Sequence, residues 1–147
     1  MKNLVIMIGI QGSGKSHFCE KFLKETHVRI NLDTLGTRHR ERLLFEEFLA
    51  GGVDCVIDNT NPTRADRARY IPSARAAGYR IIGYFVESKL KECIKRNALR
   101  EGKSRVPSCA IAATSNKLEL PSYNEGFDEL YFVKNDGKVM SVEEWRV

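Results

Sequence analysis

The sequence lacks the features that mark a disulfide-rich, zinc-binding or membrane protein. It has four cysteines in 147 residues, with no CxxC pair among them: Cys19, Cys55, Cys93 and Cys109. This scatter argues against a disulfide framework or a structural zinc site and favours a reducing compartment. The apolar run Leu4–Ile8 is far too short to cross a bilayer, and a glycine-rich stretch follows it instead of a cleavage site. We therefore expect a cytoplasmic protein with no membrane partner.

The chain carries a modest excess of positive charge, concentrated in three places. Lys and Arg number 24 against 19 Asp and Glu, which gives a net charge of +5 at neutral pH. The basic residues cluster at 38–42, 64–69 and 89–105. An anionic partner such as nucleic acid would explain these clusters, and so would three solvated helix faces. Charge alone leaves both explanations open.

Short apolar runs alternate with segments of helical pattern along the chain. We expect strands over residues 3–8, 28–32, 53–57, 79–86 and 130–133, with a turn at 136–137 leading into a strand over 138–142. Helices are expected over 14–25, 34–49, 61–77, 88–100 and 107–118. The alternation predicts one α/β domain over 1–147, a mainly parallel sheet with helices on both faces and a C-terminal hairpin or tail over about 130–147. Ligands of such folds bind beyond the carboxyl ends of the strands, where Gly9, Asp33 and Asp58 fall.

Residues Gly9–Ser16 read GIQGSGKS and match the phosphate-loop pattern G-x-x-x-x-G-K-S between an expected strand and an expected helix. The glycines let backbone N–H groups turn toward a phosphate at the start of the helix. Lys15 would reach the β- and γ-phosphates, and the hydroxyl of Ser16 would hold Mg²⁺. No N-K-x-D guanine motif is present, so ATP is the expected nucleotide. The residues expected to bind it are Gly12, Ser13, Gly14, Lys15, Ser16 and His17. The fold class that follows is a P-loop NTPase-type sandwich.

A second candidate site residue follows the third expected strand, in the stretch CVIDNTNP. An acidic residue after an apolar strand is the Walker-B pattern, so Asp58 would hold Mg²⁺ directly or through water. Asn59 and Thr60 are candidates for substrate binding. Asn59 and Asn61 equally fit turn chemistry, with Asn61 as the cap of the next helix.

Asp33 follows the second expected strand, in the stretch INLDTLG. A kinase needs a carboxylate beside the acceptor hydroxyl to orient it and to accept its proton. The end of the second strand of a P-loop fold lies beside the γ-phosphate pocket, so Asp33 fits this general-base role. The alternative is an ordinary helix cap for the segment from Thr34 onward.

Four stretches together resemble the kinase domain of polynucleotide 5′-hydroxyl kinases: the phosphate loop, INLDTLG, VIDNTNP and RADRARYIPSARAAG. The likeness is greatest to the kinase half of animal polynucleotide kinase/phosphatases, and it runs from about Val5 to Val133. It implies that Asp33 is the general base that contacts the 5′-hydroxyl. It also implies the family's phosphate-loop roles for Gly12, Gly14, Lys15 and Ser16.

Residues 95–107, KRNALREGKSRVP, resemble the lid of that family, which would span about 96–107 here. The resemblance implies that a lid arginine closes over the ATP phosphates and stabilises charge on the transferred group. Arg100 matches that position best, and Arg96 lies one helical turn earlier on the same face. The alternative is a surface helix with ordinary basic residues.

The chain departs from the family at one position. The phage member has an arginine for the acceptor phosphate three residues after its catalytic Asp, and Gly36 stands at that place here. Arg38 or Arg40 would substitute from the next turn, with Arg64 and Arg67 across the cleft. No phosphatase-like segment accompanies the kinase-like one, so we expect no end repair by this polypeptide alone.

The sequence therefore predicts a kinase that uses ATP and Mg²⁺ to phosphorylate a hydroxyl, with the 5′-OH end of a nucleic acid as the expected acceptor. Its catalytic residues would be Lys15, Asp33 and Arg100. Two other functions fit the same motifs. One is a small-molecule kinase with a closed acceptor pocket. The other is an ATP-binding regulatory module with little phosphoryl transfer.

Overall fold

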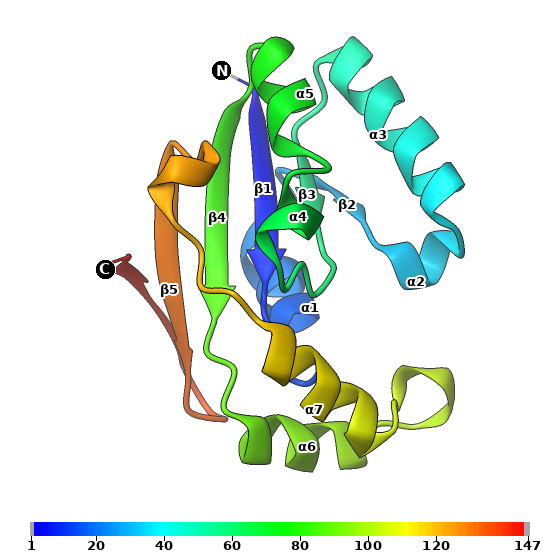
Figure 1. Cartoon of the computed structure of the whole chain (residues 1–147), viewed down its shortest axis with the longest axis vertical. Helices are drawn as coiled ribbons and strands as arrows, with labels where there is room; N and C mark the ends of the chain where they lie inside the picture. The colour runs from blue at the N-terminus through cyan, green and yellow to red at the C-terminus, as the bar shows by residue number, and fades with distance from the viewer. Residues whose placement is uncertain (1, 146–147) are drawn as a thin grey trace.

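The computed structural model describes residues 2–145 and is built on one six-stranded sheet in the order β2-β3-β1-β4-β5-β6. Its strands are β1 (Asn3–Ile8), β2 (Val28–Ile30), β3 (Cys55–Ile57), β4 (Arg80–Val86), β5 (Glu129–Asn135) and β6 (Met140–Glu144). The pairs from β2 to β5 are parallel, and β6 runs antiparallel to β5. Figure 1 shows β1 between β3 and β4. The expected mainly parallel sheet is confirmed.

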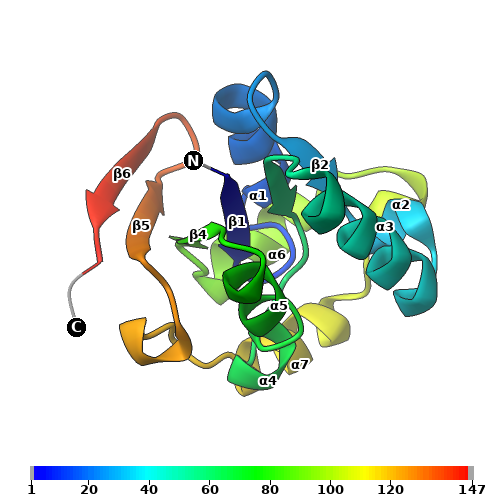
Figure 2. The ribbon, with the colours of Figure 1, turned by 90° about the horizontal axis from the view of Figure 1, so that it is seen from above.

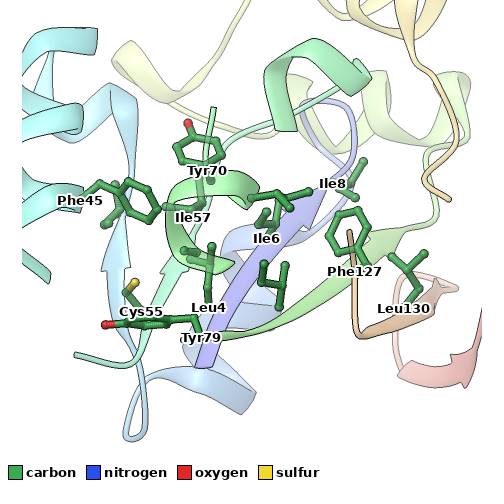
Figure 3. Close-up of a cluster of buried hydrophobic side chains, with 14 of the residues drawn as sticks. Leu4, Ile6, Ile8, Phe45, Cys55, Ile57, Tyr70, Tyr79, Phe127 and Leu130 are labelled. Atoms are coloured by element: carbon green, nitrogen blue, oxygen red, sulfur yellow. The ribbon is translucent and has the colours of Figure 1, made fainter. Parts of the chain in front are cut away.

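Strand β1 is buried on both faces, as its unbroken apolar sequence predicts for a central parallel strand. Leu4, Ile6 and Ile8 point into one hydrophobic cluster (Figure 3). Val5 and Met7, which alternate with them, point into another on the opposite face of the sheet. A core on each side requires a helical layer on each side.

Helices cover both faces of the sheet, which confirms that expectation (Figure 2). On one face lie α3 (Arg38–Gly51) and α5 (Ile71–Ala76), and on the other α1 (Lys15–Phe18) continues into a π-helix (Cys19–Leu23). Two further helices, α6 (Leu90–Ala98) and α7 (Ser108–Lys117), lie beyond the carboxyl end of β1 (Figure 1). Cys93 of α6 and Ile111 of α7 pack there against Ile10. Helices α6 and α7 therefore pack against the start of the phosphate loop.

The helix expected over 34–49 is two helices in the structure. The short α2 (Leu32–Leu35) ends at Gly36, whose φ of 88° favours glycine. Helix α3 then begins after Thr37, whose hydroxyl accepts a hydrogen bond from the N–H of Arg40 at 3.1 Å. Gly36 and the Thr37 cap therefore divide the expected helix in two.

The helix expected over 61–77 is likewise divided, into α4 (Arg64–Arg67) and α5. Thr63 caps α4 in a capping box with Asp66, so the expected cap at Asn61 is wrong. Asn61 instead adopts a φ of 44°, and its buried amide donates to the carbonyl of Met7 at 2.8 Å. It joins the loop after β3 to the centre of the sheet.

The C-terminal hairpin is present, with its turn at Asp136-Gly137 between β5 and β6. Trp145, after β6, donates its backbone N–H to the carbonyl of Leu130 at 3.0 Å. Residues 146 and 147 of the expected tail lie outside the described residues. Among residues 2–145, no helix is both long and apolar enough to span a membrane.

Arg67 is a structural residue, and its expected place across an acceptor cleft is wrong. Its side chain is 0% exposed and forms a bidentate ion pair with Glu125 at 2.7 and 3.1 Å. It also donates to the carbonyls of Asn61 and Glu119, at 3.0 and 3.1 Å. A guanidinium with all these partners joins α4 to the segment before β5 and has no surface left for a ligand.

We expect Arg67→Met to lower the free energy of unfolding by about 3–5 kcal/mol, because the buried Glu125 carboxylate would lose its close counter-charge and keep only Arg64, at 3.9 Å. Urea denaturation at neutral pH measures the loss. The control is Arg80→Met, since Arg80 pairs with Glu129 where the two side chains are 43% and 29% exposed. That change should cost under about 1 kcal/mol. Equal small losses in both variants would contradict a structural role for Arg67.

Candidate active site

The phosphate loop is a tight structure in which two glycines are required by space as well as by backbone angle. Gly12 and Gly14 have φ of 81° and 108°. A Cβ on Gly12 would lie 2.3 Å from the carbonyl oxygen of Cys93, and one on Gly14 would lie 2.5 Å from the Cε of Met140. The backbone of helix α6 therefore lies against the loop at Gly12, and side chains of the β5–β6 hairpin lie against it at Gly14.

Side chains from outside the loop bind its carbonyls. The Asn135 amide at the end of β5 donates to the carbonyl of Ser13 at 2.7 Å. Arg96 donates to the carbonyl of Gly12 at 3.1 Å and, through its other terminal nitrogen, to that of Asn135 at 3.4 Å. These hydrogen bonds to the loop carbonyls hold the glycine-rich backbone in place. The sequence reasoning missed Asn135, which a search for polar residues at every strand end would have found.

Lys15 is buried at the start of α1, where its Nζ donates to the carbonyl of Ile10 at 3.0 Å. Burial lowers the pKa of Lys15 from 10.5 to about 8, and the nearby Asp58 carboxylate partly opposes that shift. An anion bound in the loop would favour the charged ammonium in the same way. A phosphate bound in the loop would therefore offset the free-energy cost of burying the Lys15 ammonium.

Ser16, Asp58 and Arg29 form a compact polar cluster beside the loop. The hydroxyl of Ser16 donates to Asp58 Oδ2 at 3.0 Å, and Arg29 Nε donates to the same oxygen at 2.6 Å. Arg29 also donates to the Ser16 hydroxyl oxygen, from Nη2 at 3.2 Å. The other oxygen, Asp58 Oδ1, is buried with no hydrogen-bond partner in the described structure. The sequence reasoning named Ser16 and Asp58 but missed Arg29, which stands on strand β2.

Asp33 lies in the first turn of α2 and is exposed, but it is not the cap of that helix. The cap is Asn31, whose side-chain oxygen accepts the N–H of Thr34 at 3.1 Å. The Asn31 amide also donates to the carbonyl of Asp58, at 2.6 Å. The capping alternative for Asp33 is therefore wrong, because Asn31 caps the helix and the Asp33 carboxylate does not.

A buried carboxylate, Glu41, connects α3 to the strand ends. Asn59 donates to it at 2.7 Å, Tyr70 at 2.9 Å and Arg38 at 2.9 Å. The side-chain oxygen of Asn59 in turn accepts the backbone N–H of Leu32 at 2.8 Å, next to Asp33. Burial, reinforced by the Glu41 charge, raises the pKa of Tyr70 to about 12. The network fixes both the backbone that carries Asp33 and the side chain of Arg38.

The structure brings half of the expected site residues to one cleft of about 220 Å³. Its lining is Gln11, Lys15, Ser16, Asn31, Leu32, Asp33, Arg38, Asp58, Asn59, Thr60, Arg100 and Val106. The expected lid segment, 96–107, supplies Arg100 and Val106. His17 and Arg96 line a different hollow, between α1 and the β5–β6 hairpin, together with Gly14 and Asn135.

Two expected acceptor residues do not reach this cleft. Arg40 is exposed and donates to the carbonyl of Leu35 at 3.4 Å. Arg64 donates to the side chain of Asn124 at 2.9 Å and lines a hollow beside α4 and residues 124–125. Both were expected to bind substrate. Their side chains are directed elsewhere because α3 begins one turn after α2 and because α4 packs toward the segment before β5.

A second hollow, of about 340 Å³, adjoins the cleft through Arg38, which lines both. Its other lining residues are His39, Glu41, Arg42, Phe45, Arg69 and Tyr70. Arg42 and Arg69 have side chains 66% and 49% exposed, in distant contacts with Glu46 and Asp66 at 4.0 and 3.9 Å. The sequence reasoning placed them in basic clusters without assigning them. A positively charged surface therefore extends from the cleft toward α5.

A family model described as an AAA domain, AAA_33, matches residues 37–121, more than half of the chain. The chain belongs to this family. The match begins after the phosphate loop and Asp33, so these motifs are evidence in addition to it.

Three curated relatives match over most of the chain. A putative bifunctional polynucleotide phosphatase/kinase of Acanthamoeba polyphaga mimivirus is 32% identical over 88% of this chain and 32% of its own. The bifunctional polynucleotide phosphatase/kinase of Schizosaccharomyces pombe is 27% identical over 86% of this chain and 32% of its own. Transcription factor bHLH140 of Arabidopsis thaliana is 28% identical over 92% and 16%. The chain thus spans a third or less of these relatives, and its likeness to polynucleotide kinases is confirmed.

Solved structures of kinases share the fold. A sugar kinase from a Janibacter species superposes with a TM-score of 0.69 at 17% identity, covering 91% of this chain and 86% of that one. The Pnkp1/Rnl/Hen1 RNA repair complex superposes with a TM-score of 0.67 at 22% identity, covering 80% and 44%. At these identities the likeness concerns the fold, which is that of a kinase-type P-loop protein.

The Glu41 network can be tested by removing one hydroxyl. We expect Tyr70→Phe to lower the free energy of unfolding by about 1.5–3 kcal/mol, because a buried hydrogen bond to a charged group is lost. Urea denaturation measures the change, and Tyr123→Phe serves as the control, since Tyr123 is 41% exposed. The control should stay within about 0.5 kcal/mol of wild type. A Tyr70→Phe protein as stable as the control would show that the network contributes nothing.

Proposed function

We propose that the chain is an ATP-dependent kinase that transfers the γ-phosphoryl group to the 5′-hydroxyl of a polynucleotide. The observation that supports it most is the position of Asp33. Its carboxylate lines the same cleft as Lys15 and Ser16 of the phosphate loop. That is where an acceptor hydroxyl would have to lie for in-line attack on a γ-phosphate bound at the loop.

In this proposal Asp33 orients the acceptor hydroxyl and accepts its proton as the oxygen attacks phosphorus. The proton moves from the hydroxyl to the carboxylate, the new O–P bond forms, and the bond to the β-phosphate oxygen breaks. The chain fixes Asp33 through the Asn31 cap and through the Asn59 bond to the backbone of Leu32. It leaves the carboxylate exposed to the incoming substrate.

Two cations of the cleft would stabilise the charge that develops on the transferred group. Lys15 lies at the start of α1, and Arg100 enters from the segment after α6. The charge of Arg100 is close enough to contribute to the lowered pKa of Lys15. We further propose that residues 96–107 act as the lid of a single kinase domain over 1–147, with Arg96 and His17 on the nucleotide side.

Mg²⁺ fits the residues present. Asp58 presents a buried oxygen with no partner, Oδ1, while its other oxygen, Oδ2, accepts a hydrogen bond from the Ser16 hydroxyl. A magnesium ion is bound by one or two protein oxygens together with substrate phosphates and water, so this donor set suffices. Ser16 and Asp58 would hold it, and when bound it would neutralise charge on the β- and γ-phosphates. A cytoplasmic location remains a prediction from the sequence.

The acceptor class is proposed from the basic hollow beside the cleft. Arg38 lines both spaces, and Arg42 and Arg69 continue the positive surface away from Asp33. Phosphates that follow a 5′-hydroxyl along a strand would meet these arginines in turn. The two relatives named polynucleotide phosphatase/kinase support this choice. The small volume of the cleft itself, about 220 Å³, keeps a small-molecule acceptor as the second candidate.

Replacing Asp33 by Asn tests the general base. We expect Asp33→Asn to lower kcat by roughly 10²–10⁴, because the amide cannot accept the proton, with little change in nucleotide affinity. Phosphoryl transfer from labelled ATP to a 5′-OH oligonucleotide measures kcat, and calorimetric titration with an ATP analogue measures the nucleotide affinity. Glu47→Gln, a change on the exposed surface of α3, is the control. A variant with wild-type kcat would remove Asp33 from the mechanism. A wild-type protein that binds ATP and transfers nothing would favour a regulatory module.

The acceptor class is tested by salt. Each phosphate neutralised on a single strand should contribute a slope of about −0.7 to the dependence of log affinity on log salt. We expect Arg38→Gln and Arg69→Gln each to reduce the slope of the acceptor KM by about that amount, with ATP saturating throughout. Arg40→Gln is the matched control, because Arg40 lies outside the cleft, and it should leave the slope unchanged. A flat response in wild type would support the small-molecule acceptor.

A further inference from the structure

Arg29 occupies the position at which the proposed function, on which this inference rests, requires a metal. The guanidinium contacts both residues that would hold Mg²⁺: Asp58 at 2.6 Å and the Ser16 hydroxyl oxygen at 3.2 Å. Ser16 also donates to Asp58, at 3.0 Å. The three groups are therefore joined to one another, and Asp58 Oδ1 alone is left without a hydrogen-bond partner among them.

This contact matters because of where the charges lie. The Asp58 side chain is 1% exposed, and Arg29 is its ion-pair partner. A buried carboxylate without a counter-charge is unstable, so a cation has to lie beside Asp58. Lys15 is also near Asp58, but Arg29 is the cation in direct contact with the carboxylate. Arginine cannot lose its proton in a protein, so Arg29 supplies that charge at every accessible pH. Arg29 thus neutralises the charge of Asp58 before any metal binds.

A magnesium ion would need the Ser16 oxygen that Arg29 uses, and it would lie beside the Asp58 carboxylate, whose Oδ1 is free for it. It binds oxygen lone pairs at about 2.0–2.1 Å and demands near-octahedral geometry. The Ser16 oxygen already accepts from Arg29 Nη2, and Asp58 Oδ2 already accepts from Arg29 Nε. A magnesium ion bound by Ser16 and Asp58 would also repel the Arg29 guanidinium, because both are cations in a partly buried site. Entry of the metal requires the guanidinium to leave Ser16.

Arg29 has room to leave. It stands on β2, the edge strand of the sheet, and its side chain is 44% exposed. The hollow on its other side is lined by Cys19, Glu20, Leu23, Lys24, His27 and Val28. Glu20 offers a carboxylate there; it pairs with Lys24 at 2.8 Å, and both side chains are 65% exposed. A rotation about the arginine side-chain torsions would therefore take the guanidinium from one acidic group to another.

We propose that Arg29 is a resident counter-cation that competes with Mg²⁺ for Ser16 and Asp58. In the metal-free state it supplies positive charge next to the phosphate loop, so the chain binds ATP without a divalent ion. When Mg²⁺ is present, Arg29 has to be displaced, which raises the concentration of metal needed to reach the tight complex. Arg29 is a positioning residue in this scheme, because it acts through Ser16 and Asp58.

The test measures nucleotide binding and not turnover. A non-hydrolysable ATP analogue with an imido β,γ-bridge is titrated calorimetrically into the whole chain at constant ionic strength, first in EDTA and then across a Mg²⁺ series. For Arg29→Gln we expect metal-free binding to weaken about tenfold, because a charge close to the phosphates is removed. The Mg²⁺ concentration at half-maximal tightening should fall by about three- to tenfold, because the competitor is gone.

Two further variants serve as controls. Arg29→Lys keeps the charge, so it should behave like wild type in EDTA. Arg80→Gln removes an arginine of matched geometry, whose Nε lies 2.6 Å from Glu129 and whose side chain is 43% exposed, on β4 away from the cleft. It should leave both measurements unchanged. Circular dichroism melting shows that each variant is folded before it is titrated.

The outcomes separate this inference from the proposed function. An Arg29→Gln protein that matches wild type in both titrations would overturn it and leave Arg29 as a link between β2 and the loop after β3. A rise in the Mg²⁺ requirement would also overturn it, because Arg29 would then be orienting Asp58 for the metal. A wild-type chain that binds no nucleotide in either condition would overturn the proposed function itself.

Discussion

Three strand ends are joined by hydrogen bonds between the polar residues that follow them, and the site depends on this junction. Gly9 after β1 donates its N–H to the carbonyl of Thr60 after β3, at 3.0 Å. The amide of Asn31 after β2 donates to the carbonyl of Asp58 at 2.6 Å, and Asn59 accepts from Leu32 at 2.8 Å. Backbone groups at the end of a buried sheet need partners. Here they find them in one another, which fixes the phosphate loop, Asp58 and Asp33 at one rim.

The same rim explains how the sequence reasoning succeeded and where it failed. The apolar runs and the phosphate loop predict the sheet and the carboxyl-end site, because buried parallel strands need continuous apolar sequence. The helices were predicted too long, because Gly36 ends α2 early and because the chain between Arg67 and Ile71, just before Pro72, separates α4 from α5. Arg67 was assigned to the cleft because sequence reports charge and not direction. Its partners, Glu119 and Glu125, are more than fifty residues away in the chain.

Residues that support the loop from behind were the least predictable part. Asn135 and Arg96 act through single hydrogen bonds to loop carbonyls. The sequence reasoning named Arg96 only as a lid residue and left Asn135 out, because neither contact follows from the local sequence. Arg29 sits in an exposed edge strand, where a basic residue reads as ordinary surface. Its importance depends on the distance to Asp58, which only the pairing of β2 with β3 brings about. Long-range strand order therefore decides its environment.

Exposure separates the arginines of this chain into two kinds. Arg67 is fully buried, with every donor group bound to a fixed acceptor, so it can only stabilise the fold. Arg38 and Arg29 have side chains 42% and 44% exposed, and each pairs with a nearly buried carboxylate, Glu41 or Asp58. A half-exposed guanidinium can exchange its partner for an anionic ligand or give way to a metal, because water replaces the contacts it gives up, provided that another cation then lies beside the buried carboxylate. The fold thus buries the acidic group of each of these two pairs and leaves the arginine half-exposed at the cleft. That is the arrangement a site requires if phosphates and metal ions are to enter and leave it.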